Sequence, residues 1–281
     1  MNVVAKYVAL VVVGILMIAL LVVGFGSWWF GQRVTREVKA FYGDANFAED
    51  VLVTEAMLQG APAPIQRYLR HAGVVGKPMV HSVRLEQEGR FRTGMGQPWM
   101  PIRAEEFYSV DPPGFIWDAK FYMAGLPILR VRDSYRDGKG EILGKIGGLV
   151  TMLQDEGEGL DQGAMLRYLQ EMIWFPSAFL GDNISFTPID DGSAQVTFTD
   201  HGKSVTGTLF IDPEGNVTNF VAERFRSDKN ALGTWTTPMS EVGEFEGLQL
   251  PIAGKGVWLQ PEGDYEYVDL TVTQLEYDAT R

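Results

Sequence analysis

An uncharged run near the N-terminus, from Tyr7 to Gln32, constrains this chain more than any other feature. Its central part, from Val8 to Phe25, is almost wholly aliphatic. An α-helix rises about 1.5 Å per residue, so about 20 such residues cover the ~30 Å hydrocarbon core of a bilayer. A cleaved secretory signal has a shorter apolar run, of about 7–15 residues, and a small-residue cleavage site. We therefore predict that residues 1–32 form an uncleaved transmembrane anchor, with a cleaved signal as the alternative.

The residues that flank the apolar run bear on its orientation. Trp28-Trp29-Phe30 comes directly after the run and suits an aromatic belt at a membrane interface. Lys6 precedes the run, whereas Arg33, Arg36 and Lys39 lie after it, and this count slightly favours a cytoplasmic C-terminal domain. The layout points the other way, because a short tail, one span and a large domain are typical of a signal anchor that exports the domain attached to it. On layout, we predict that the domain is exported.

Charge and composition exclude several classes of function. The chain has 36 acidic and 24 basic residues and a net charge of −12. A nucleic-acid partner is not expected, because such binding depends on cationic side chains that neutralise phosphates. The absence of cysteine excludes disulfides, thiolate metal sites and a cysteine nucleophile.

Beyond the anchor, the pattern predicts two regions. Residues 33–77 form a polar helical stalk and two short helices, one capped by Asp44 and running through Leu58, and one from Ile65 to Ala72 that ends before Gly73. Residues 78–281 alternate with period two and form a single antiparallel β-rich domain with a helical insertion at 161–180. The strands expected there include Glu141 to Leu153 and Trp235 to Phe245.

Several of these strands are apolar on both faces, although a sheet wetted on one side alternates cleanly. One explanation is that the helices close an ordinary core. The other is a curved, open half-barrel with a helical lid and a cavity for a lipid or acyl chain. The fold class is therefore mainly β, an α+β arrangement with a curved antiparallel sheet or open half-barrel. The residues expected to line the cavity are Phe115, Trp117, Phe121, Met165, Leu169, Ile173 and Trp174.

No catalytic signature is found in the sequence, which has neither a phosphate-binding loop nor a nucleophile or zinc-protease motif. Its three histidines lack the spacing of metal ligands, so no metal and no cofactor is expected. Asp118, Asp133 and Glu223 are the polar side chains expected to point inward. An inward carboxylate is either a general acid with a raised pKa or the partner of an arginine such as Arg130.

Four segments occur in an order that resembles an uncharacterised bacterial family of single-span, membrane-anchored proteins. They are Pro62–Leu69, Gly114–Ala119, Val131–Gly140 and Arg167–Pro176, and the likeness extends over residues 60 to 278. That family has no established activity, so the resemblance supplies no catalytic residue. It implies a bacterial source. Together with the anchor and the export predicted above, this places the protein in the inner (cytoplasmic) membrane, with a periplasmic or extracytoplasmic domain. In architecture alone, the layout is also similar to the half-barrel of lipoprotein carriers such as LolA and LolB.

Three functions are open at this point. The first is a non-enzymatic envelope protein that binds an apolar ligand, a lipid or acyl chain, in the half-barrel. The second is a structural or assembly module that binds another envelope protein. The third is a hydrolase that uses Asp118 or Glu223, which is disfavoured because no activating base or metal accompanies these carboxylates.

Overall fold

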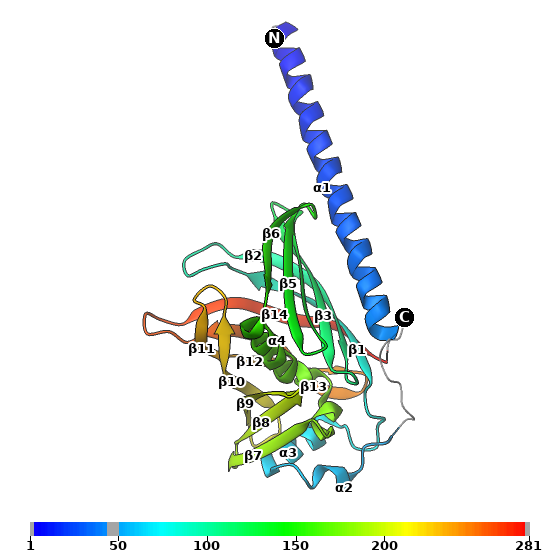
Figure 1. Cartoon of the computed structure of the whole chain (residues 1–281), viewed down its shortest axis with the longest axis vertical. Helices are drawn as coiled ribbons and strands as arrows, with labels where there is room; N and C mark the ends of the chain where they lie inside the picture. Colours follow the sequence, from blue (N-terminus) through cyan, green and yellow to red (C-terminus); the bar gives the residue numbers. More distant parts are fainter. Residues whose placement is uncertain (1–2, 44–50, 279–281) are drawn as a thin grey trace.

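The computed structural model describes residues 3–43 and 51–278. The strands in this part of the chain form one antiparallel sheet in the order β6-β5-β4-β3-β2-β1-β14-β13-β11-β10-β9-β8-β7, with β12 paired to β13. The sheet curls into the open half-barrel expected from the sequence (Figure 1). The strands are β1 (Ser82–Phe91), β2 (Met100–Ser109), β3 (Gly114–Met123), β4 (Leu126–Arg136), β5 (Lys139–Ile146), β6 (Val150–Glu156), β7 (Ile184–Asp190), β8 (Ser193–Asp200), β9 (Lys203–Ile211), β10 (Val217–Arg226), β11 (Ala231–Thr236), β12 (Met239–Phe245), β13 (Leu248–Trp258) and β14 (Tyr265–Tyr277).

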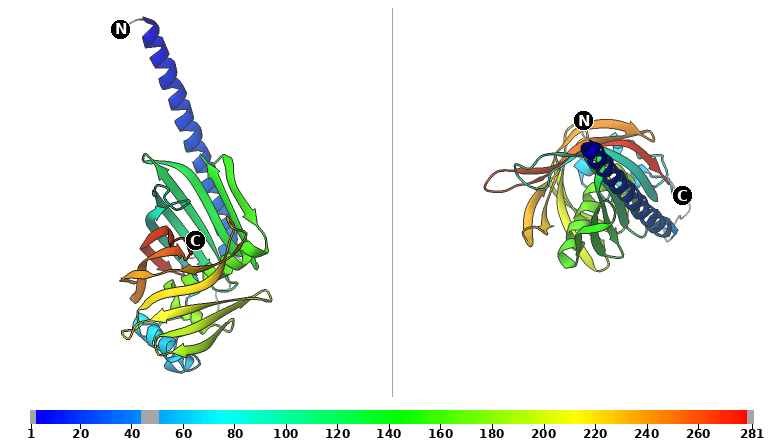
Figure 2. Two further views of the ribbon diagram at one scale, coloured as in Figure 1. Left: turned by 90° about the vertical axis from the view of Figure 1, so that its left-hand side faces the viewer. Right: turned by 90° about the horizontal axis from the view of Figure 1, so that it is seen from above.

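The long N-terminal helix runs along the outer face of the sheet, and the shorter helices lie inside its curl and at its lower end (Figures 1 and 2). The predicted helix before Gly73 is confirmed, because Pro64 lies in its first turn and Gly73 ends it in the left-handed conformation, at φ 81°. Leu58, Tyr68 and Leu69 belong to the main core, so the short helices are packed into the domain. The helices are α1 (Val3–Gly43), α2 (Glu55–Leu58), α3 (Ala63–Ala72), α4 (Glu158–Glu171), η1 (Met172–Trp174) and η2 (Pro176–Leu180).

Both faces of the sheet bury apolar side chains, each against a different helix. In β3, Phe115, Trp117 and Phe121 lie on the inner face, where they join the core formed with α3, α4 and η1. Ile116 points to the opposite, outer face and belongs to a separate cluster. Successive residues of a strand point to opposite faces, so a strand covered on both sides reads as apolar throughout.

The outer face is covered by the second half of α1 (Figure 2). Phe30, Val34 and Phe41 are each 3% exposed and pack with Ile116 and Leu143 of the sheet. The predicted stalk is therefore helical, but its apolar stripe docks on the domain instead of standing free in solvent. A hydrophobic stripe at a spacing of three, four and seven residues is what a helix needs to bury one face.

Arginine side chains add polar contacts between α1 and this face. Arg130 Nη1 donates a hydrogen bond of 2.6 Å to the backbone oxygen of Ser27. Arg132 Nε lies 3.3 Å from Glu37 Oε2, and the Arg132 side chain is 7% exposed. Tyr42 Oη donates to the backbone oxygen of Val83 at 2.8 Å. These bonds fix the helix at several points along its length against β4 and β1.

Three elements differ from the sequence-based expectation. The strand expected from Glu141 to Leu153 is two strands, because Gly147-Gly148 forms a turn in which both residues have positive φ. The strand expected from Trp235 to Phe245 is also two, separated at Pro238, which has no N–H for the ladder. The helix expected through Leu58 begins only at Glu55.

The shortened helix has a local cause. Asp44 lies outside the described residues, and residues 51–54 are extended. There the Val53 N–H donates to the backbone oxygen of Lys77 at 2.9 Å, and Leu52 pairs with Pro78 in a β-bridge. Backbone groups that bond to a distant segment in this way are not free for the i to i−4 bonds of a helix.

We predict that Val34→Asp detaches α1 from the sheet and lowers the free energy of unfolding by more than about 2 kcal/mol, because it buries an unpaired charge. Thr35→Asp is the matched control, since Thr35 lies one residue on and is exposed. Urea unfolding in detergent and limited proteolysis near residue 43 measure both effects. Equal behaviour of the two variants would contradict the docking of α1.

Candidate functional site

The side chains expected to line a ligand site meet inside the half-barrel. They come from β3, α4 and η1, and all belong to one core cluster in which each is at most 9% exposed. At these positions the side chains pack against one another. The residues are Phe115, Trp117, Phe121, Met165, Leu169, Ile173 and Trp174.

α4 lies along the inner face, inside the curl of the sheet (Figure 1). Its N-terminal part is held by Asp161, whose carboxylate accepts hydrogen bonds from the Gly140 N–H at 2.8 Å and from Lys203 Nζ at 2.7 Å. On its other side, Tyr168 Oη donates to the backbone oxygen of Ser109 at 2.9 Å. Glycine is needed at 140, because a Cβ there would lie 2.6 Å from the backbone oxygen of Leu160.

A buried charge cluster joins the middle of α4 to the sheet. Arg167 donates to Glu106 Oε1 at 2.7 Å, to Asp133 Oδ2 at 2.8 Å and to Glu171 Oε1 at 2.8 Å. All four side chains are at most 14% exposed. The guanidinium also lies over the ring of Trp117, 4.9 Å from its centroid. One cation therefore faces three carboxylates in a region with little water.

Burial raises the pKa of two of these carboxylates. Burial raises the pKa of Glu106 well above its usual value, against the opposing effect of Arg167. Burial also raises the pKa of Glu171, with Arg167 again opposing the change. The cluster is enclosed by the core, and Tyr108 Oη donates to Glu171 Oε2 at 3.0 Å. Its chemistry suits the attachment of α4 to the sheet better than the transfer of a proton to a substrate.

The three carboxylates expected to point inward lie in three different places. Asp133 does point inward, where it meets Arg167. The inward position expected for Asp118 is wrong, because it is buried on the outer face beneath α1, where it forms a bidentate ion pair with Arg130. Glu223 is exposed, so its expected inward position is wrong, and its carboxylate accepts from Thr234 Oγ1 at 2.6 Å. The structure does not bring them together as an acid–base pair.

Sequence reasoning missed Arg167 and Glu106, the centre of the buried cluster. The available signal was Arg167 itself, a charged residue between the apolar positions Leu166 and Tyr168 of a helix expected to face the core. Glu171 is a local partner, four residues further along α4. Glu106 and Asp133 come from β2 and β4, so only the pairing of strands places them beside Arg167.

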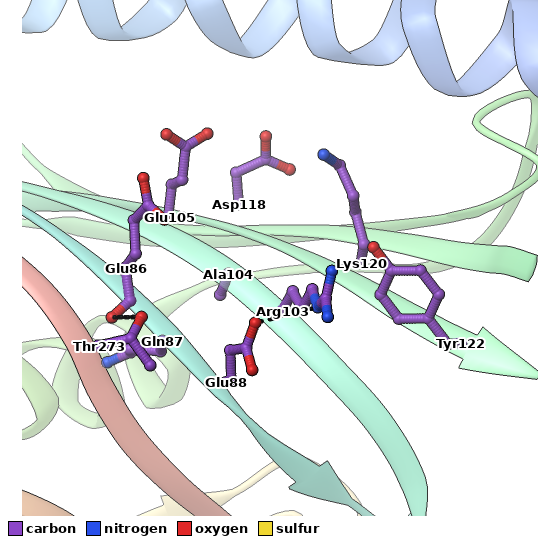
Figure 3. Close-up of a pocket in the computed structure, with 10 residues that line it drawn as sticks. All are labelled: Glu86, Gln87, Glu88, Arg103, Ala104, Glu105, Asp118, Lys120, Tyr122 and Thr273. Carbon is purple, nitrogen blue, oxygen red and sulfur yellow. Dashed lines mark hydrogen bonds and ion pairs between the residues drawn. The ribbon is translucent and has the colours of Figure 1, made fainter. Parts of the chain in front are cut away.

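Two hollows of about 280 Å³ each open on the outer face. The first lies over β1, β2 and β3, and Figure 3 shows Glu105, Asp118 and Lys120 on its side nearest α1. Arg103 Nε pairs with Glu88 Oε1 there at 3.1 Å. Within residues 3–43 and 51–278, no group of three or more histidine or acidic side chains is placed to hold a metal ion. Both hollows are strongly polar and do not suit an apolar ligand.

The inner face stays apolar beyond the part that α4 covers. A Cβ on Gly144 would lie 3.1 Å from Leu153 Cβ and 3.7 Å from Leu129 Cδ1, so both leucines border the same position on the inner side of β5. Leu129 is partly buried against the core, whereas Leu153 is 42% exposed and Ile146, at the end of β5, is 39% exposed. We call Phe121, Leu129, Ile146 and Leu153 the apolar mouth of the half-barrel.

We predict that Arg167→Met lowers the free energy of unfolding at pH 7 by ~3–5 kcal/mol, because it leaves three carboxylates buried without their cation. The loss should shrink as the pH falls, since protonated carboxyls need no counter-charge. In the unaltered protein, the raised pKa values of Glu106 and Glu171 act in the same direction. The folded state holds these protons more tightly than the unfolded state, so the free energy of unfolding falls as the pH rises from the ordinary pKa values to the raised ones. Denaturant titrations at pH 5 and pH 7 measure this dependence.

The control is Arg103→Met, because the Arg103 side chain is 67% exposed and its pair with Glu88 is expected to contribute no more than ~1 kcal/mol. A loss for Arg167→Met that is equally small, or that does not depend on pH, would contradict the role assigned to the charge cluster.

The solved structures with a similar fold include the following three. They are a "putative outer membrane lipoprotein-sorting protein domain" from Vibrio parahaemolyticus (9% identity, TM-score 0.45, covering 80% of this chain and 92% of that one), a DUF1329 family protein from Desulfovibrio piger (11%, 0.44, 77% and 92%) and a LolA superfamily protein from Nitrosomonas europaea (8%, 0.42, 80% and 93%). The last belongs to the class of half-barrel that the layout of the sequence resembles. Identities and TM-scores of this size carry no information about a ligand.

No curated protein matches the chain. A family model described as a family of unknown function, DUF6544, matches residues 51–270, which include β1 to β13, α4 and the first six residues of β14. The match leaves α1 outside and covers more than half of the chain. The chain therefore belongs to the DUF6544 family, a family of unknown function.

Proposed function

We propose that this protein is a membrane-anchored, non-enzymatic protein of the bacterial envelope that binds an apolar ligand, a lipid or acyl chain, in its half-barrel. The observation that carries the proposal is the apolar mouth. The side chains of the apolar mouth extend the apolar inner surface from the buried core to solvent. They lie near the β3–β4 and β5–β6 turns, beyond the part of the inner face that α4 covers. An exposed apolar surface that leads into a concave sheet is a favourable site for an acyl chain.

The anchor in this proposal is the first part of α1. An 18-residue window of this helix has a mean hydropathy of 3.2, and none of it is buried against the rest of the chain. Its length and composition suit a bilayer span. The same helix continues without a break into the part docked on the sheet, which supports a retained anchor over a removed signal. With the exported orientation, the half-barrel lies outside the cytoplasm at the inner membrane.

The side chains expected from the sequence to line the site form the deeper part in this proposal. Phe121 links this deeper part to the apolar mouth. It is itself a residue of the apolar mouth, and the centroid of its ring lies 6.3 Å from that of Trp117. Access to Trp117, Met165 and Leu169 requires α4 to move away from the inner face. The buried charge cluster makes such movement conditional, because separating Arg167 from its carboxylates is costly unless they are solvated or protonated.

We predict that lipid reaches the apolar mouth of the full chain in vesicles. A phosphatidylcholine with a diazirine in its acyl chain, activated by light, should label peptides that contain Phe121 and Leu129. Leu153→Asp should lower this labelling about tenfold, the factor that corresponds to ~1.4 kcal/mol. Peptide mass spectrometry locates the label.

The matched control is Ile189→Asp, at an exposed apolar position on β7 at the opposite edge of the sheet, which should leave the labelling unchanged. Labelling confined to α1, or equal labelling of Phe121 in the two variants, would contradict binding in the half-barrel.

A second candidate, an assembly module that binds another envelope protein, is favoured by β6. This strand is at the end of the sheet, and six of its seven residues are exposed. An open edge of this kind can pair with a strand of another chain. We predict that, if this role holds, a photoreactive residue in place of Thr151 forms one defined adduct with another protein in bacterial membranes. Failure to form such an adduct would remove this candidate.

A further inference from the structure

The turn between β5 and β6 is pressed against α1 where the apolar run of the helix ends. A Cβ on Gly148 would overlap the backbone oxygen of Gly26, and a Cβ on Gly26 would overlap the backbone oxygen of Gly147. Gly147 also lies beside Val23, because a Cβ on Gly147 would lie 3.3 Å from Val23 Cγ2. Three glycines thus permit a backbone-to-backbone approach that no other residue would allow. This contact places the β5–β6 turn beside Val23 and Gly26 of α1.

That level is the end of the predicted span. The exposed aliphatic residues of α1 precede Gly26, and Trp28 and Trp29 lie just after it, each 55% exposed. Tryptophans at the end of an apolar span are enriched at the membrane–water interface. If α1 crosses a bilayer, the β5–β6 turn therefore lies at the interface as well.

The strand turns at this level expose an unusual set of large apolar side chains. They belong to two neighbouring hairpins, β3–β4 and β5–β6, whose tips both point along α1 toward its N-terminus (Figure 1). Each residue is between 44% and 63% exposed. Exposed apolar side chains that gather in one region in this way mark an interaction site with a protein or a membrane. We call this set the apolar rim: Met123, Leu126, Leu149, Val150 and Met152.

The charge around the apolar rim is the reverse of that of the whole chain. Segments 119–131 and 143–153 carry Lys120, Arg130 and Lys145 and no acidic residue, although the chain has a net charge of −12. Arg130 is paired with Asp118, so Lys120 and Lys145 supply the cationic character. Aliphatic tips flanked by lysines suit insertion into an interface with anionic headgroups, whereas the acidic remainder of the domain would be repelled from it.

We propose that the apolar rim inserts into the interfacial region of the bilayer that α1 crosses, so that the domain is held against the membrane at two places. The inference rests on the anchoring part of the proposed function. It also extends that function, because the apolar mouth, with Ile146 and Leu153 at its edge, then opens directly onto the lipid. An acyl chain could enter the half-barrel without passing through water.

The experiment uses single cysteines, which label cleanly because the chain contains no other cysteine. Leu149→Cys and, in the neighbouring hairpin, Met123→Cys are each labelled with the fluorophore NBD in the full chain. Each is reconstituted in phosphatidylcholine–phosphatidylglycerol vesicles with and without bromine on the acyl chains. Two further positions serve as references, Val12→Cys inside the apolar run and Ile189→Cys on β7.

We expect brominated lipid to quench the emission at Leu149 and Met123 at least about twofold, as it quenches Val12, because side chains inserted at an interface contact the acyl chains. Emission at Ile189 should not change. Quenching at Val12 but at neither rim position would overturn the rim inference and leave the anchor intact. Quenching at none of the positions would overturn the anchor, and with it the inference. Emission at the rim positions that is blue-shifted but not quenched would place these side chains against protein instead of lipid and would overturn lipid insertion.

Discussion

The packing of α1 on the outer face of the sheet determines how the rest of the molecule is placed. A single apolar helix joined to the domain by a flexible linker would leave the domain free to tumble above a membrane. Here Phe30, Val34 and Phe41 are buried on the sheet, and glycine contacts at Gly26 hold the β5–β6 turn against the same helix. The direction of the helix therefore sets the direction of the half-barrel. Any role at a membrane depends on this rigid connection.

The inner face is closed by a different kind of contact. Aromatic and aliphatic side chains of α4 pack into the curl, but a charge cluster on Arg167 lies at the middle of this interface. A well-packed apolar core of the same volume would often be as stable, so buried ion pairs are weak evidence for stability alone. Their directional bonds fix α4 in one position, and they couple that position to the protonation of Glu106 and Glu171.

The sequence predicted the fold class because its strongest signals are local. Alternating residues, glycine and proline turns and the cap at Gly73 each act within a few positions. The apolar residues on both faces of β3 were also visible, but the sequence did not reveal that α1 covers the outer face. That contact joins residues about 80 positions apart, such as Val34 and Ile116, and no local pattern encodes it. The same holds for Arg167, whose partners Glu106 and Asp133 are brought to it only by strand pairing. For Glu223, strand periodicity predicted an inward side chain, but the structure places this residue on the exposed surface.

The central claim is that the half-barrel takes up an apolar molecule at the bilayer surface. Native mass spectrometry of the full chain tests this claim most directly. The chain is released from lipid nanodiscs under conditions that strip lipids from a single exposed helix. The account predicts a population that retains the mass of one lipid or fatty acid and loses it when Leu153→Asp alters the apolar mouth. A bare chain under all conditions, or an adduct that the Leu153→Asp variant keeps, would contradict it.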